Sequence, residues 1–156
     1  MAFLPLDRRH LLSGVGLSWL MLQANPAVAR SAPDRQPLTQ AAEKTKAGYL
    51  ARARALRDQA VKAGDQAYGA VVVRDGVIVG EGRNYVVLHS DPTAHAELLA
   101  VRDAARRLKT RDLSDCEVYS TATPCPMCQA ALFWARIRRY HNESTPSAGV
   151  APKLAC

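Results

Sequence analysis

Apolar and polar positions repeat with two different periods along the chain, and the change of period separates predicted helices from predicted strands. Over residues 39–64 apolar residues recur every three or four positions, which predicts a helix that ends at a glycine. Two β-branched runs, 68–73 and 77–82, flank Asp75-Gly76, which favours a tight hairpin because both residues tolerate a positive φ. Residues 84–90 show neither period and are predicted to form a loop.

Capping residues predict the elements of the second half. Asp91 suits a helix N-cap, and Pro92 suits the first helical position, where its missing N–H costs nothing. The helix that follows is expected to bury an apolar stripe consisting of Ala94, Leu98, Val101, Ala105 and Leu108. A short strand over 117–121 precedes Cys125-Pro126, which repeats the cap-then-proline device and begins a last helix that extends to Ile137.

The order helix, hairpin, helix, strand, helix predicts an α/β domain in which helices cover a sheet. We assign residues 39–140 to this domain. Residues 141–156 are expected to form an irregular tail, because their start is polar and turn-prone and no strand pattern follows Arg139.

Residues 1–29 have the three-part pattern of a secretory signal peptide. Arg8-Arg9 precede the apolar run 11–22, and the small residues Ala27-Val28-Ala29 stand at cleavage spacing. The two arginines resemble a twin-arginine signal, which is read by a receptor and is not a membrane anchor. We therefore expect a periplasmic protein with a flexible leader over 30–38; an ordinary signal or a short uncleaved anchor is the alternative.

Composition and charge narrow the class further. The chain has 156 residues, 48% hydrophobic and 22% charged, which fits one globular domain and excludes a collagen-like or wholly disordered chain. No window offers the ~18 uninterrupted apolar residues of a spanning helix, which excludes a polytopic membrane protein. The net charge is +7, and its basic runs over 102–111 and 136–139 would attract nucleic acid. A solvated helix face accounts for them better, because no aromatic residues interleave the runs, so we do not expect a nucleic-acid partner.

Three side chains carry donors that suit Zn²⁺, namely His95, Cys125 and Cys128. All three fall at predicted helix starts, where free N–H groups and the helix dipole favour anions and should lower the pKa of the two thiols. Three protein ligands leave a fourth tetrahedral position for water, as in catalytic zinc sites. Glu97, two residues after the histidine, is the expected proton carrier between such a water and a leaving amine.

The spacing of these residues is more specific than either short motif alone. His95-Ala96-Glu97 followed by Pro124-Cys125-Pro126-Met127-Cys128 is the combination typical of zinc deaminases. The main rival is thiol–disulfide exchange by the Cys-x-x-Cys pair at a helix start, which leaves the histidine and the glutamate without a role. Four cysteines, three of them after residue 120, are too few and too clustered for a disulfide framework.

Three segments resemble the cytidine and deoxycytidylate deaminase superfamily, and within it the guanine deaminase and tRNA adenosine deaminase branch. They are Asp91-Pro92-Thr93-Ala94-His95-Ala96-Glu97, Thr121 through Cys128, and Trp134-Ala135-Arg136-Ile137. The resemblance implies a three-layer α/β/α sandwich, usually a homodimer. It also implies that the three predicted ligands hold zinc, that the glutamate shuttles protons and that Asn84 hydrogen-bonds the substrate base.

The chain departs from the family pattern at two places. Thr123 stands where this branch usually carries a glutamate, which alters the surroundings of the metal ligands. The family continues after its third helix with a strand, a helix and a further strand, whereas residues 141–149 here are polar. The sandwich is therefore expected to be incomplete at the C-terminus, with the third strand as an exposed edge.

These observations predict a zinc-dependent hydrolase of C–N bonds that deaminates a free purine base or nucleoside, with guanine as the first guess, and releases ammonia. Deamination of adenosine in tRNA is an alternative, which the expected export disfavours. A non-catalytic zinc-binding remnant of a truncated deaminase and an exported thiol-redox protein are the others.

Overall fold

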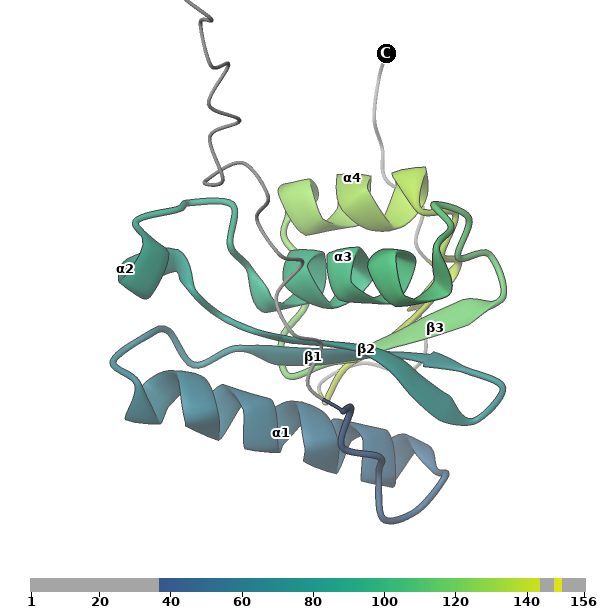
Figure 1. Ribbon diagram of the computed structural model, residues 1–156, viewed down its shortest axis with the longest axis horizontal. Coiled ribbons are helices and arrows are strands. Elements are labelled where there is room, and N and C mark those ends of the chain that lie inside the picture. Colours follow the sequence, from purple (N-terminus) through teal and green to yellow (C-terminus); the bar gives the residue numbers. More distant parts are fainter. Residues whose placement is uncertain (1–36, 144–147, 150–156) are drawn as a thin grey trace, which may run out of the picture. The chain divides into compact units, whose positions relative to one another are not determined.

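A five-stranded sheet with helices on both faces organises the residues that the computed structural model describes, 37–143 and 148–149 (Figure 1). The helices are α1 (Lys46–Lys62), α2 (Val86–His89), α3 (Ala96–Leu108) and α4 (Pro126–Trp134). The strands are β1 (Gly69–Arg74), β2 (Val77–Arg83), β3 (Cys116–Ser120), β4 (Arg139–His141) and β5 (Ala148–Gly149).

The strands lie in the order β2-β1-β3-β4-β5. The predicted hairpin is confirmed, since β1 and β2 pair antiparallel around Asp75 and Gly76, whose φ angles are 50° and 74°. β3 pairs antiparallel with β1 and parallel with β4, and β5 adds antiparallel to β4. The passage from β2 to β3 runs through α3, as a crossover requires.

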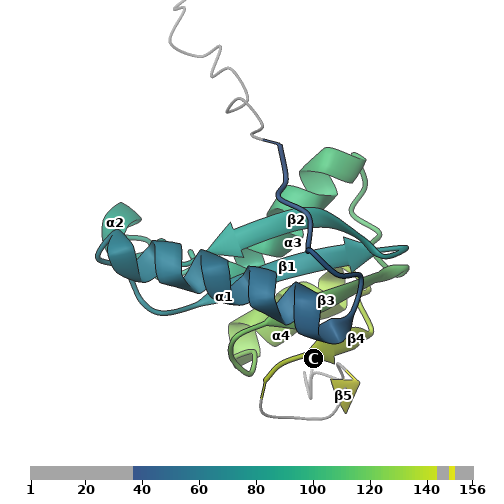
Figure 2. The same ribbon diagram turned by 90° about the horizontal axis from the view of Figure 1, so that it is seen from below.

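Helix α1 covers one face of the sheet, and α3 and α4 cover the other, so the α/β/α sandwich is confirmed (Figures 1 and 2). Each face has its own apolar cluster. Val71, Val73 and Ile78 pack with α1, whereas Val72 and Val118 pack with α3 and with Leu132 of α4. Strand β1 is buried on both faces, which explains its unbroken run of apolar residues.

Helix α3 lies unusually close to β2. A Cβ built on Gly82 would lie 2.1 Å from the carbonyl oxygen of Ala96, and one on Gly80 would lie 2.6 Å from that of Ala100. Only glycine leaves room for a helix backbone at such a distance. The two glycines of β2 therefore determine where α3 begins, and with it the position of His95.

The start and the buried face of α3 differ from the prediction. Asp91 does not cap the helix; its Oδ1 accepts hydrogen bonds from the backbone N–H and the hydroxyl of Thr93, in a separate turn, and His95 becomes the N-cap residue. The buried residues of the helix are Ala96, Glu97, Ala100, Val101 and Ala104. The small alanines occupy the close approach to β2, and Ala105 and Leu108 lie only at the margin of the cluster.

Three smaller differences concern the other helices. Helix α1 begins at Lys46 rather than near residue 39, because the side chain of Thr45 caps it by accepting a hydrogen bond from Gly48 N. The predicted loop over 84–90 contains the four-residue helix α2. Helix α4 ends at Trp134, three residues before the predicted end.

The C-terminal part differs more. Strand β4 lies beside β3, so β3 is not the exposed edge that was expected. Its residues show no β-branched pattern. Glu117 of β3 instead makes an ion pair of 2.8 Å with Arg139 and a contact of 2.8 Å with Nε2 of His141 across the paired strands. Between them Tyr140 is 3% exposed. Strand β5 falls within the residues that were expected to be irregular.

The expected export signal, nearly all of the expected leader and residues 150–156 lie outside the described residues. Within the described ranges, no helix combines the length and the apolar character that crossing a membrane requires.

Candidate metal centre

The structure brings the three predicted zinc ligands together from the starts of two helices. His95 is the N-cap residue of α3, and Cys125 is the N-cap residue of α4, one turn before Cys128. The ligand atoms of the three side chains all lie within 4.8 Å of one another. Nδ1 of His95 lies 3.7 Å from the Sγ atom of each cysteine.

These distances fit a tetrahedral ion. Zinc bonds of ~2.0 Å to nitrogen and ~2.3 Å to sulfur, at a tetrahedral angle, separate the two ligand atoms by ~3.5 Å. Cys₂His is a donor set that Zn²⁺ prefers, and three ligands are the number found in catalytic sites, where water takes the fourth position. The residues present therefore fit zinc.

The expectation of a lowered thiol pKa is wrong for Cys128 in the protein without a metal. The helix start was expected to lower the thiol pKa values, but burial above all, and then the negative charges of Glu97 and Cys125, raise the pKa of Cys128. Cys128 is 1% exposed, and its Sγ atom lies 3.7 Å from the Glu97 carboxylate. Burial and this carboxylate therefore outweigh the positive partial charge of the helix N-terminus. A bound dication supplies the missing positive charge.

The predicted proton carrier lies beside the ligands. Glu97 is in the first turn of α3 and only 4% exposed. Its Oε2 atom lies 3.7 Å from Sγ of Cys128, and its Oε1 atom accepts a hydrogen bond of 3.0 Å from the hydroxyl of Ser120. The carboxylate therefore has one oxygen held by β3 and the other directed toward a metal ligand.

Asn84 follows β2, on the segment that leads to the ligand histidine. The backbone N–H of its neighbour Tyr85 donates to the carbonyl of Ala94, the residue before His95. The Asn84 side chain is fully buried, and its Nδ2 donates to Oδ1 of Asp65 at 2.9 Å and to Oε1 of Gln66 at 3.2 Å. Among the residues that the structure describes, none donates to its Oδ1 atom. An unsatisfied buried oxygen is costly, which is typical of a site that a ligand completes.

Asp65 was not predicted, because no periodicity or spacing distinguishes it in the turn after α1. Its carboxylate also accepts from the backbone N–H of Leu88 at 3.0 Å and of Gln66 at 2.8 Å. Although burial opposes ionisation, these bonds and the one from Asn84 lower the pKa of Asp65 to about 2. An ionised Asp65 can only accept hydrogen bonds, so it fixes the Asn84 amide with its nitrogen toward Asp65 and its oxygen on the other side.

The loop before the cysteines is supported by β4. Thr123, which replaces the usual glutamate, accepts a hydrogen bond of 3.0 Å from Nδ2 of the buried Asn142. The hydroxyl of Tyr140 donates to the carbonyl of Ala122. Two side chains from the C-terminal strand region thus hold the backbone that leads to Cys125.

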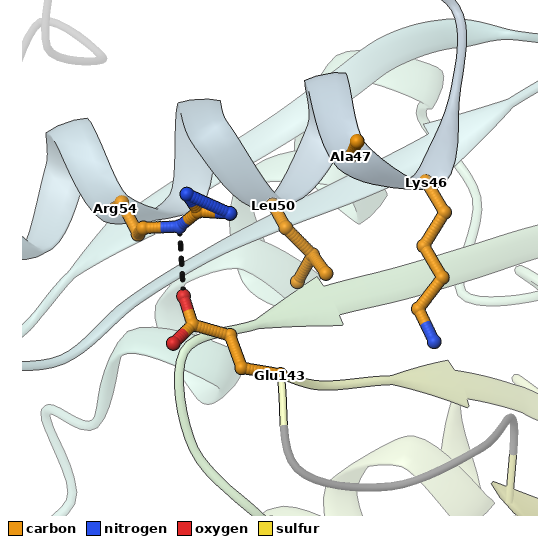
Figure 3. A pocket seen from close by; sticks show the side chains of 5 residues that line it. All are labelled: Lys46, Ala47, Leu50, Arg54 and Glu143. Atoms are coloured by element: carbon orange, nitrogen blue, oxygen red, sulfur yellow. Dashed lines mark ion pairs between the residues drawn. The ribbon is translucent and has the colours of Figure 1, made fainter.

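A pocket elsewhere on the molecule contains none of these residues. It lies along the start of α1 and is lined by Lys46, Ala47, Leu50, Arg54 and Glu143 (Figure 3). Arg54 and Glu143 face each other across it in an ion pair of 2.8 Å. The candidate site is therefore identified by the convergence of His95, Cys125 and Cys128 and not by the pocket at the start of α1.

Comparisons with known proteins agree with this geometry. The sequence model of the cytidine and deoxycytidylate deaminase zinc-binding region matches residues 43–142. The guanine deaminase of Bacillus subtilis is 45% identical over 103 residues, 64% of this chain and 66% of that protein. The tRNA-specific adenosine deaminase of Aquifex aeolicus is 45% identical over 87 residues, 54% of this chain and 58% of that protein. This chain thus spans about three fifths of the length of these relatives.

Solved structures show the same likeness. The X-ray structure of the Bacillus subtilis guanine deaminase superposes with a TM-score of 0.61 at 42% identity, and the match covers 63% of each chain. The guanine deaminase of Nitrosomonas europaea superposes with the same TM-score, 0.61, at 29% identity, over 69% of this chain and 62% of that one.

We expect Cys128→Ser to lose most of the bound zinc and to lower the midpoint of urea unfolding, because metal binding and folding are coupled. Zinc is measured by atomic absorption on protein purified without chelator. Cys116→Ser is the matched control, since Cys116 is also buried but lies outside the ligand group. Full zinc occupancy in Cys128→Ser, or equal loss in both variants, would contradict the assignment.

Proposed function

Because this chain belongs to the cytidine and deoxycytidylate deaminase zinc-binding family, we propose that it is a zinc-dependent hydrolytic deaminase of a purine base or nucleoside. The observation that carries the proposal is the Cys₂His group with a buried carboxylate beside it, in which Oε2 of Glu97 lies 3.7 Å from Sγ of Cys128. A structural zinc site would need a fourth protein ligand and no proton carrier.

The reaction replaces an exocyclic amine by an oxygen and releases ammonia. When bound, zinc supplies a water whose pKa is lowered to ~7. Glu97 would accept the first proton of that water at Oε2 and deliver it to a ring nitrogen of the base as the water oxygen bonds to the amine-bearing carbon. It would then take the second proton of the same water and pass it to the amine, which leaves as ammonia. Asn84 holds the base through its amide, which Asp65 orients.

Guanine is the first substrate that we propose, since a guanine deaminase is among the relatives with 45% identity. Adenosine in tRNA is the second, because a tRNA-specific adenosine deaminase matches at the same identity. The expected export favours the free base. Ammonia release measured across free bases, nucleosides and a tRNA anticodon stem-loop separates the two, and release from none of them by zinc-loaded protein would favour the non-catalytic remnant.

The homodimer that the family resemblance implies stays a prediction. Phe133 and Trp134, at the end of α4, are 48% and 71% exposed and form an edge-to-face pair. A second copy that covered them would remove this apolar surface from water.

We expect Glu97→Gln to retain zinc and to lower kcat by ~10²–10⁴-fold, because the amide keeps the shape of the side chain but carries no proton. Glu81→Gln is the matched control: Glu81 is bound by Arg52 at the outer strand and contacts none of the site residues named above. Comparable kcat values in Glu97→Gln and the wild type would contradict the mechanism.

We expect Asn84→Ala to raise KM by about tenfold with a smaller change in kcat, since it removes a hydrogen bond to the base that is present before the reaction. Steady-state kinetics on the best substrate of the panel measures both constants. Thermal unfolding of the same variant is the control, because Asp65 and Gln66 lose a partner as well. An unchanged KM in a folded, active Asn84→Ala protein would refute the role in binding.

We further propose export by the twin-arginine route, which carries folded proteins and would suit a zinc site assembled inside the cell. The support is Arg8-Arg9 before a mildly apolar segment. Changing both arginines to lysine is expected to retain the precursor in the cytoplasm, as measured by cell fractionation. Lysine at Arg30 and Arg35 is the matched control. Undiminished export of the Arg8/Arg9 variant would point to the general secretory route.

A further inference from the structure

The last residue of β3 places a hydroxyl between the proposed proton carrier and the loop that leads to the metal ligands. Side chains alternate along β3, so Ser120 shares the α3 and α4 face with Val118 and Cys116, and it is fully buried. Its Oγ atom lies 3.0 Å from Oε1 of Glu97. No spacing in the sequence distinguishes this serine.

A backbone N–H also contacts the hydroxyl of Ser120. The backbone N–H of Ala122 donates to Oγ of Ser120 at 3.3 Å, which occupies an acceptor position of the hydroxyl. A hydroxyl has one hydrogen to donate, and the Glu97 oxygen accepts it. The same Ala122 is held through its carbonyl by Tyr140, so the hydroxyl is tied to a fixed backbone.

We infer that Ser120 is a positioning residue for the deamination proposed above, which holds Oε1 of Glu97 so that Oε2 alone faces the metal site. One oxygen of the carboxylate is thus held by β3, and the other lies beside the sulfur of a metal ligand. Without the Ser120 hydroxyl, the carboxylate would lose the contact that holds Oε1.

The test compares two single-hydroxyl deletions at the same strand end in zinc-loaded protein. Ser120→Ala removes the contact with Glu97. Thr121→Val removes a hydroxyl of similar placement that bonds to Gly69 of β1 instead. Ser120→Thr restores a hydroxyl. Zinc content, kcat and KM are measured for all three.

Ser120→Ala is expected to keep its zinc and its KM within about twofold while kcat falls by at least about tenfold, as for a lost hydrogen bond to a charged group. Thr121→Val is expected to keep kcat, and Ser120→Thr to recover most of it. An unchanged kcat in Ser120→Ala, or an equal loss in Thr121→Val, would overturn the inference.

A second readout does not depend on turnover. In protein labelled with ¹³C at the glutamate side-chain carboxyl, the Glu97 signal is assigned by its loss in Glu97→Gln. It is expected to shift in Ser120→Ala and to stay in place in Thr121→Val; an unmoved signal in Ser120→Ala refutes the contact. If the wild type deaminates no substrate while this shift is seen, the proposed function fails and the positioning of Glu97 by Ser120 stands.

Discussion

The close approach of α3 to β2 is the constraint on which the site depends. The carbonyl oxygen of Ala96 lies 2.1 Å from the position that a Cβ of Gly82 would take, and Ala96 stands between His95 and Glu97. Any side chain at that strand position would displace the first turn of the helix, and interiors packed at this density transmit such a displacement instead of absorbing it. The cysteines belong to a different helix, so the 3.7 Å separation of nitrogen and sulfur requires both helix starts to be held against the same sheet.

Placing the ligands together creates an electrostatic problem that the protein alone does not solve. Two thiolates and the Glu97 carboxylate would bring three negative charges into a largely buried site, and helix N-termini offset only part of that charge. Burial, together with the neighbouring negative charges, raises the pKa of Cys128, so without a cation the proton stays on its sulfur. The ligand geometry is in place, whereas the charges of the two thiolates are balanced only when a dication binds, and this ties zinc binding to deprotonation of the cysteines.

Local signals in the sequence predicted the hairpin, the helices and the ligand group, because turn residues and ligand spacing act over a few positions. The prediction failed where distant contacts decide. Strand β4 consists of Arg139, Tyr140 and His141, which have no strand pattern, and it forms because Glu117 of β3 pairs with two of them. Asp91 has the chemistry of a helix cap, yet its hydrogen bonds to Thr93 make a separate turn. Asp65 and Ser120 act through hydrogen bonds to residues about twenty positions away, which no motif records.

The strand that the sequence did not predict also changes what Thr123 implies. The loop before Pro124 is held by neutral side chains from β4 and from the residue that follows it. Asn142 donates to the Thr123 hydroxyl, and Tyr140 donates to the carbonyl of Ala122. Ala122 in turn donates to Ser120, whose hydroxyl holds Glu97. A continuous set of hydrogen bonds thus runs from Tyr140 of β4 through Ala122 and Ser120 to the proposed proton carrier, and it places no additional carboxylate beside Glu97.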